Sequence, residues 1–392
     1  MSNEELNLKD NNATTVKKNR ESGIELLKII AIAFIIIAHV VQTLVEENTF
    51  ISYSDYIIDV STSSLVPQNI ILVLLFHLGQ FGNSIFFICS AWFLLNSSKY
   101  SKKKCFLMIV EVWVISIIFL ISTFFPLRDQ LSKKIIIKSI FPTFFSNNWY
   151  ITCYVLFYAI HPLLNSVIDK MSKKQLLRSV LALSFLYIFC NFIRSGLFFS
   201  SYLILWTTIY FDIAFMKKYL MSFADNIKAN VILLIINFIG FVAIVLLTEV
   251  LGQHISFLYD KQLHWVSTYN IFLILMSVAL FNLFRNMHFH NKFINYISSL
   301  SLLAYIIHEN IIIRTYYRPM LWNCIYSNFG YDYVIGWVFI IAAAIFAGSI
   351  ILSALYSLTI KRLVDKVASK LYDCLKDIYL KIEIKLVKDD KE

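Results

Sequence analysis

The chain has 392 residues, of which 58% are hydrophobic and 15% charged, and its formal net charge is +10. Soluble domains carry about 25% charged residues and rarely expose large apolar patches, so this composition excludes an ordinary soluble fold. On a soluble protein the positive charge would suggest nucleic-acid binding. Beside apolar spans it marks cytoplasmic loops instead, and no nucleic-acid partner is expected.

The N-terminal segment, residues 1–20, is polar and contains no Phe, Trp or Tyr. This composition predicts a disordered cytoplasmic tail. The first apolar run that follows is long, and no small-residue cleavage site comes after it, so it is predicted to be a membrane helix and not a signal peptide.

Ten apolar spans follow, each near the length that crosses about 30 Å of hydrocarbon at about 1.5 Å per helical residue. They predict an all-α, polytopic membrane bundle of about ten transmembrane helices. The sixth span is the weakest, because it is short and close to its neighbour. The spans are Ile24–Val45, Ile70–Leu95, Cys105–Phe125, Trp149–Ile168, Leu176–Ile193, Leu197–Phe215, Ala229–Val250, Trp265–Phe284, Phe293–Ile313 and Tyr333–Ile360.

The loops between these spans give the orientation, because lysine and arginine collect on the cytoplasmic side of membrane proteins. Basic residues gather in the N-terminal tail, in the second, fourth, sixth and eighth loops, and after the last span. We therefore expect both termini in the cytoplasm. The third loop departs from the rule with Arg128, Lys133, Lys134 and Lys138. Its segment Leu131–Phe144 is predicted to be a short amphipathic helix on the outer surface.

The C-terminal segment, residues 361–392, alternates apolar and lysine-rich stretches. It is predicted to be a cytoplasmic, amphipathic, basic tail that lies on anionic lipid. The transmembrane domain then covers residues 21–360. The chain is rich in Ile, Lys and Asn, which is typical of an AT-rich bacterial genome, so we expect a multi-pass protein of a bacterial cytoplasmic membrane.

The first span is the richest in ionisable groups, each of which is a functional candidate because charge is costly in lipid. It holds Glu25, Lys28 and, after an apolar stretch, His39. Eleven residues make about three helical turns, which places Lys28 and His39 within about 20° of one face and about 16 Å apart. This stripe would suit a path for an anionic donor from the cytoplasm. The alternative is structural: Lys28 extends to lipid headgroups and His39 hydrogen-bonds to a neighbouring helix.

The ninth span adds a second histidine at a depth comparable to that of His39. His308 follows Tyr305 by three residues, so both lie on one helical face. His77 and His161 also lie inside spans, and for these two we expect hydrogen bonds between helices. No metal site is predicted, because the histidines lack ligand spacing.

Four motifs in chain order resemble the acyltransferase 3 family of membrane acyltransferases, over about Arg20 to Ser357. Arg20-Glu-Ser-Gly-Ile-Glu25-Leu-Leu-Lys28 followed by His39 resembles the family's Arg/Lys-x10-His signature. The run from Phe86 to Leu94 is similar to its FFxxSGxxL segment, with Ala91 in place of the usual Gly. Asn148-Trp149-Tyr150 resembles the WYL opening of a helix. The fourth motif, Ser298-x-x-Ser301-x-x-x-Tyr305-x-x-His308, is similar to SxxSyxiYLiH.

The resemblance implies transfer of an acyl group, usually acetyl, from cytoplasmic acyl-CoA to a sugar hydroxyl of the cell envelope or an exopolysaccharide. Acyl transfer needs a base or a nucleophile, and histidine serves as either near neutral pH. His39 is the candidate for general base or transient acyl carrier. Lys28 and Arg20 would bind the phosphates of acetyl-CoA, and Glu25 would order the cytoplasmic mouth by pairing with a basic neighbour. His308 and Tyr305 would position the acceptor, which could be lipid-linked, or share the proton transfer.

A different class of function is a transporter or flippase for a lipid-linked saccharide, in which the same buried groups form a polar path. Two features argue against it. The sequence has no internal repeat of half the chain, and no pair of helices broken by Gly or Pro occupies matching positions. The sequence thus favours a membrane O-acetyltransferase.

Overall fold

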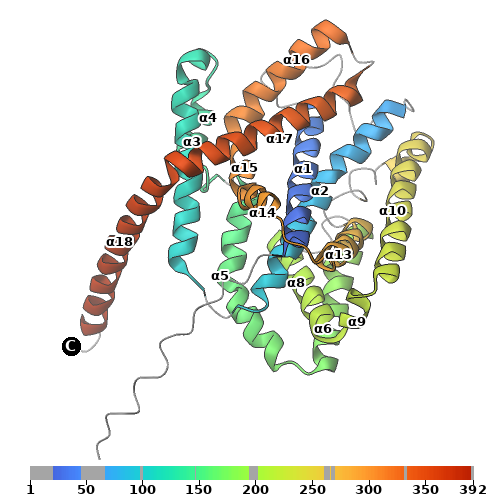
Figure 1. Ribbon diagram of the computed structural model, residues 1–392, viewed down its shortest axis with the longest axis horizontal. Helices are drawn as coiled ribbons and strands as arrows, with labels where there is room; N and C mark the ends of the chain where they lie inside the picture. Colours follow the sequence, from blue (N-terminus) through green and yellow to red (C-terminus); the bar gives the residue numbers. More distant parts are fainter. Residues whose placement is uncertain are drawn as a thin grey trace, which may run out of the picture.

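The computed structural model describes residues 21–45, 67–97, 100–145, 147–193, 202–259, 265, 270–330 and 333–389. Every regular element in these ranges is helical, which confirms the predicted all-α class (Figure 1). The predicted N-terminal tail, residues 1–20, lies outside the described residues. The candidate Arg20 belongs to this tail, so it also lies outside them.

Seven helical stretches among the described residues are long and apolar enough to cross a membrane, which confirms a polytopic helical bundle. The count of ten stays a prediction. The seven are α1 (Ser22–Val45), α2 (Pro67–Leu94), α3 (Lys102–Leu127), α5 (Trp149–Lys170), the continuous run of α6 (Lys173–Ser184), η1 (Phe185–Phe189) and α7 (Cys190–Ile193), then α10 (Ile227–Val250) and α17 (Val334–Thr359).

Two further predicted spans correspond to shorter or more polar helices. The sixth is α8 (Tyr202–Tyr219), which carries Asp212, Lys217 and Lys218. The eighth is α13 (Ile271–Arg285), an apolar helix of 15 residues. Short helical turns complete this part of the chain: α9 (Met221–Ala224), η2 (Leu251–Gln253) and α11 (Ser256–Tyr259).

The ninth predicted span differs from the prediction, because it is not one helix. It forms α14 (Lys292–Ser299) and α15 (Ser301–His308), and then the chain leaves helical geometry at Glu309. Asn310 Oδ1 accepts a hydrogen bond from the Ile312 N–H at 3.0 Å, which starts the next helical segment. That segment comprises the π-helical turn η3 (Ile313–Tyr317) and α16 (Arg318–Phe329).

The third loop contains a helix, as predicted, in the form of α4 (Lys133–Ile140) with Ser132 as its N-cap. This helix returns along α3: Ser116 Oγ donates to the Ser139 carbonyl at 2.8 Å, and the rings of Trp113 and Phe141 are in contact. Ser116 lies near the middle of α3. The chain that leads into α5 therefore starts beside the middle of a membrane-spanning helix.

The centre of the bundle is α1, which packs against α2, α13, α14, α15, α16 and α17 (Figure 1). The contact with α2 is close: a Cβ on Gly82 would lie 2.6 Å from the Ala31 carbonyl oxygen. By contrast α10 exposes Ile232, Ile236 and Ile239, as a lipid-facing helix does. Among the seven described membrane-spanning stretches, α1 therefore has the largest buried share.

The basic tail forms α18 (Lys361–Asp389), which packs against α3. Lys361 pairs with Glu111 in the interior of α3, and Lys103 pairs with Asp373 at 3.2 Å. Its apolar residues Leu363 and Val367 are exposed. The amphipathic helix was predicted, and its contact with anionic lipid stays a prediction.

Candidate functional site

One polar cluster joins the start of α1 to α14 at the end of α1 that is predicted to face the cytoplasm. We therefore call it the cytoplasmic cluster, and it comprises Glu25, Lys28 and Ser298. Glu25 Oε2 accepts from Lys28 Nζ at 2.7 Å and from Ser298 Oγ at 2.5 Å. The side chain of Glu25 is 7% exposed and that of Lys28 is 21% exposed. The basic neighbour of Glu25 is therefore Lys28 itself, three residues along the same helix.

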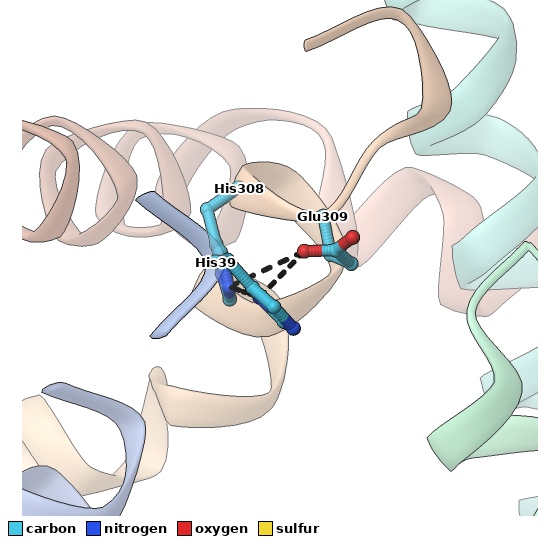
Figure 2. Close-up of side chains that lie close together, drawn as sticks. All are labelled: His39, His308 and Glu309. Carbon is cyan, nitrogen blue, oxygen red and sulfur yellow. Dashed lines mark hydrogen bonds and ion pairs between the residues drawn. The ribbon is translucent and has the colours of Figure 1, made fainter. Parts of the chain in front are cut away.

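The second cluster lies further along α1, and we call it the deep cluster: His39, His308, Glu309 and Arg318. His39 Nδ1 lies 2.6 Å from Glu309 Oε2 and 3.1 Å from His308 Nε2. Figure 2 shows the two imidazole rings and the carboxylate meeting at this point. His308 and Glu309 are almost fully buried, and the side chain of His39 is 15% exposed. The fold thus places the two predicted histidines in direct contact.

The hydrogen bonds of the deep cluster assign the tautomers of both histidines. His308 Nδ1 donates to the Ala304 carbonyl at 2.8 Å, because a carbonyl oxygen only accepts. The neutral ring then leaves His308 Nε2 as an acceptor. Because Glu309 is a carboxylate held by two arginines, the proton between it and His39 Nδ1 belongs to His39, and in the neutral imidazole Nε2 then carries no proton. This is the nitrogen a general base uses.

Two arginines hold the carboxylate of Glu309. Arg318 Nη2 donates to Glu309 Oε2 at 3.2 Å, while its Nη1 donates to the His39 carbonyl at 2.8 Å. Arg314, in η3, contacts Glu309 Oε1 at 3.4 Å and is 34% exposed. Arg318 therefore fixes both the carboxylate and the backbone that carries its imidazole partner. A fork of donors in fixed geometry is what arginine, and not lysine, provides.

The turn after α15 makes this arrangement possible. The chain reverses at Glu309 and Asn310, and α16 returns to α1, where Trp322 Nε1 donates to the Val40 carbonyl at 3.0 Å. Arg318 lies one turn before Trp322 on α16, so it faces the same part of α1. A straight ninth helix, as predicted, would carry Arg318 away from His39.

The structure brings together only part of the predicted set. His39, His308 and Tyr305 adjoin one another, since the rings of Tyr305 and His308 lie 5.7 Å apart. Glu25 and Lys28 form the separate cytoplasmic cluster. Arg20 is outside the described residues.

Sequence reasoning missed three charged residues of the site: Glu309, Arg314 and Arg318. The sequence contained a signal for each, because all three lie in or beside an apolar run. A charged residue in such a run is a functional candidate, since charge is costly in lipid. Glu309 also directly follows a histidine that the sequence did single out. The predicted span ended at Ile313, and this boundary placed the two arginines in a loop.

Of the other two membrane histidines, His77 departs from the expectation. Both ring nitrogens of His77 lack a hydrogen-bond partner among the described residues, and its ring packs against Phe76 and Phe241. The predicted interhelical hydrogen bond of His77 is therefore wrong. His161 Nδ1 donates to the Tyr158 carbonyl of its own helix. Neither residue adjoins the deep cluster.

Three ligand-type atoms of His39, His308 and Glu309 lie within 4.8 Å of one another. Sequence spacing gave no hint of this, because the fold brings the groups together from distant segments. Two observations favour a shared proton over a metal ion here. The distance from His39 Nδ1 to Glu309 Oε2 is that of a hydrogen bond, and the guanidinium of Arg318 contacts the same oxygen. A cation at this point would meet that positive charge directly.

Comparison with known proteins identifies the family of the chain. A family model described as an acyltransferase domain matches residues 21–355, which include both clusters. No curated protein and no solved structure matches the chain.

Proposed function

We propose a specific reaction for this membrane acyltransferase, because the chain belongs to the acyltransferase 3 family. It moves an acetyl group from cytoplasmic acetyl-CoA to a hydroxyl group of a cell-envelope or exopolysaccharide sugar. The protein would act in the cytoplasmic membrane of a bacterium. The observation that carries the proposal is the His39–Glu309 hydrogen bond, which leaves His39 Nε2 free to accept a proton.

His39 acts as the general base in this proposal. Its Nε2 takes the proton of the sugar hydroxyl while the hydroxyl oxygen attacks the thioester carbonyl carbon. Glu309 stabilises the imidazolium that forms, as a carboxylate does behind a catalytic histidine. The imidazolium then returns its proton to the departing CoA thiolate. His308 fixes the orientation of the His39 ring through the Nδ1 proton that the two histidines and Glu309 share.

The acyl donor would approach from the cytoplasmic cluster. Lys28 is partly exposed, and within the described part of the chain it forms an ion pair with Glu25 on the same helix. Because the ammonium of Lys28 is the partly exposed member of this pair, a phosphate group of CoA can compete for it. Two more cations, Lys217 and Arg285, lie over the indole of Trp92 at the expected cytoplasmic ends of their helices. Together they make this end of the bundle attractive to an anionic donor.

The test uses the full-length protein in lipid vesicles, supplied with acetyl-CoA labelled in the acetyl group and with envelope glycan from cells that lack the protein. We expect label on glycan hydroxyls with the wild type and none above background with His39→Ala. The matched control is His77→Ala, a buried membrane histidine away from the deep cluster. Retained transfer in His39→Ala would overturn the role of His39. Transport of glycan without any label would favour a flippase instead.

A further inference from the structure

A groove lies where α5 ends and α6 begins, on the side of the bundle that is predicted to face the cytoplasm. Its volume is about 450 Å³. A water molecule takes about 30 Å³ of liquid, so the groove has room for a group much larger than one water. Six residues from the end of α5 and the first two turns of α6 line it: Val167, Lys170, Met171, Gln175, Arg178 and Ser179. None of them belongs to the cytoplasmic or the deep cluster.

Hydrogen bonds of side chains hold the turn that forms this groove. Ser172 caps α6, since its Oγ accepts from the Gln175 N–H at 3.3 Å and its own N–H donates to Gln175 Oε1 at 2.9 Å. Lys218 of α8 holds the end of α5, where its Nζ donates to the Ile168 carbonyl at 3.2 Å. The helix α8 also packs against both α5 and α6. These contacts fix the positions of the two helix ends that line the groove.

The groove is positively charged. Lys170 and Arg178 are exposed, and within the described part of the chain neither forms an ion pair. Residues 170–178 contain four basic residues and no Asp or Glu. The acidic residue just before them, Asp169, pairs with Lys218 at 2.8 Å. The two cations of the groove therefore receive no counter-charge from the described residues, and they favour an anionic ligand.

Exposed apolar side chains continue from the groove along both helices, away from the turn. On α5, Leu163 lies one helical turn before Val167 and is 67% exposed. On the other side, Leu181 and Phe185 follow Arg178 at spacings of three and then four residues, and they are 60% and 57% exposed. These spacings keep them on the helix faces that line the groove. We call Leu163, Val167, Leu181 and Phe185 the apolar stripe.

We propose that this groove binds an anionic phospholipid of the adjoining leaflet. Lys170 and Arg178 contact the phosphate of its headgroup, and its acyl chains lie along the apolar stripe. An ammonium and a guanidinium both bind phosphate oxygens through charge-assisted hydrogen bonds. The lipid carries a net negative charge, because the quaternary ammonium of a choline lipid would be repelled by the same two cations. This inference goes beyond acyl transfer, and it is tested without turnover.

The apolar stripe favours a lipid over a soluble anion such as acetyl-CoA. A phospholipid presents an anion and two apolar chains together, which matches cations at the turn and apolar side chains beyond it. The aliphatic stems of Lys170 and Arg178 can lie along apolar surface while their charged ends reach the headgroup region, as long basic side chains do at membrane interfaces. The nucleotide portion of acetyl-CoA would match the two cations alone.

The test uses the purified full-length protein in detergent, mixed with equal amounts of phosphatidylglycerol and phosphatidylcholine of the same chain length. Native mass spectrometry counts the lipids that each protein molecule retains, and we expect the wild type to retain phosphatidylglycerol in preference. In the double variant Lys170→Gln with Arg178→Gln, the apparent Kd for phosphatidylglycerol should rise about tenfold or more, because two contacts to one phosphate are lost. The melting temperature without added lipid should equal that of the wild type, because both side chains are exposed.

The matched control is Lys228→Gln with Lys292→Gln, which removes two exposed cations on the same predicted side of the bundle but outside the groove. Its Kd for phosphatidylglycerol should stay within about twofold of wild type, because exposed charges far from the lipid are screened. An unchanged Kd in the groove variant, or an equal rise in the control, would overturn the inference. So would displacement of the retained lipid by acetyl-CoA at equal concentration, which would assign the groove to the acyl donor.

Discussion

The cytoplasmic and deep clusters both join α1 to the α14–α15 segment, and each is centred on a carboxylate. The difference lies in where the charged partners of that carboxylate come from. The buried Glu25 pairs with the partly exposed Lys28, three residues along its own helix. Glu309 pairs with His39 from a helix 270 positions earlier in the chain and with Arg318 from the helix that follows, almost fully buried.

This difference determines how easily each carboxylate can exchange its charged partner. The ammonium of Lys28 is partly exposed, so it can turn toward another anion while Ser298 Oγ still donates to Glu25. Removing one partner of a buried ion pair costs about 3–5 kcal/mol, because the other charge stays buried without compensation. The cytoplasmic cluster therefore suits reversible binding. The deep cluster suits a fixed catalytic geometry.

The change Glu309→Gln should break the deep cluster most completely. The neutral amide cannot stabilise a His39 imidazolium and can hold the wrong tautomer, so we expect kcat to fall about 10³-fold or more. It also leaves Arg318 and Arg314 without their carboxylate, so the melting temperature should fall. Labelled acetyl transfer and thermal denaturation in the same detergent measure the two effects.

The matched control for that change is Glu111→Gln. Glu111 is a buried carboxylate on α3 that pairs with Lys361 of α18, away from both clusters. It should lower the melting temperature while kcat stays within about threefold of wild type. Equal losses of kcat in the two variants would mean that Glu309 acts only through stability.

A smaller effect is expected from Arg318→Lys, which keeps the charge and removes the fork. A single ammonium cannot hold both the His39 carbonyl and Glu309, so His39 shifts within the site. Misplacement of about 1 Å costs about 10²-fold in kcat. Arg314→Lys is the control, since the native Arg314 is partly exposed and contacts Glu309 Oε1 at 3.4 Å. A kcat of Arg318→Lys equal to that of wild type would mean that the charge alone suffices. A similar loss in both variants would mean that the effect is not specific to the fork of Arg318.

The sequence predicted the parts of the site that depend on local periodicity. The stripe of Lys28 and His39 follows from the helical repeat alone. Glu25 was predicted to pair with a basic neighbour, and the structure identifies that neighbour as Lys28, three residues along the helix. The all-α class follows from apolar runs in a chain with few charges. These features need no knowledge of which helices are neighbours.

The deep cluster depends on events that periodicity does not encode. The apolar run around His308 continues past Glu309 to Ile313, so it reads as one span, yet the polar pair Glu309 and Asn310 ends the helix. The reversal there brings Arg318 to His39. In the same way, α4 returns along α3 and sets Tyr150 opposite Tyr305, although the sequence suggests only a surface helix.

The smallest effect on acetyl transfer is expected from changes in the cytoplasmic cluster. These changes test whether that cluster binds the donor, as the deep cluster is tested for catalysis. Lys28→Ala should raise KM for acetyl-CoA about tenfold and leave kcat nearly unchanged, because it removes a charge-assisted contact that substrate and transition state share. Glu25→Gln should have the opposite effect on KM. It releases Lys28 from its partner, so KM for acetyl-CoA should equal the wild-type value or fall below it. A KM that rises equally in both variants would mean that the pair is structural, because loss of either member would then disturb the same packing of α1 on α14.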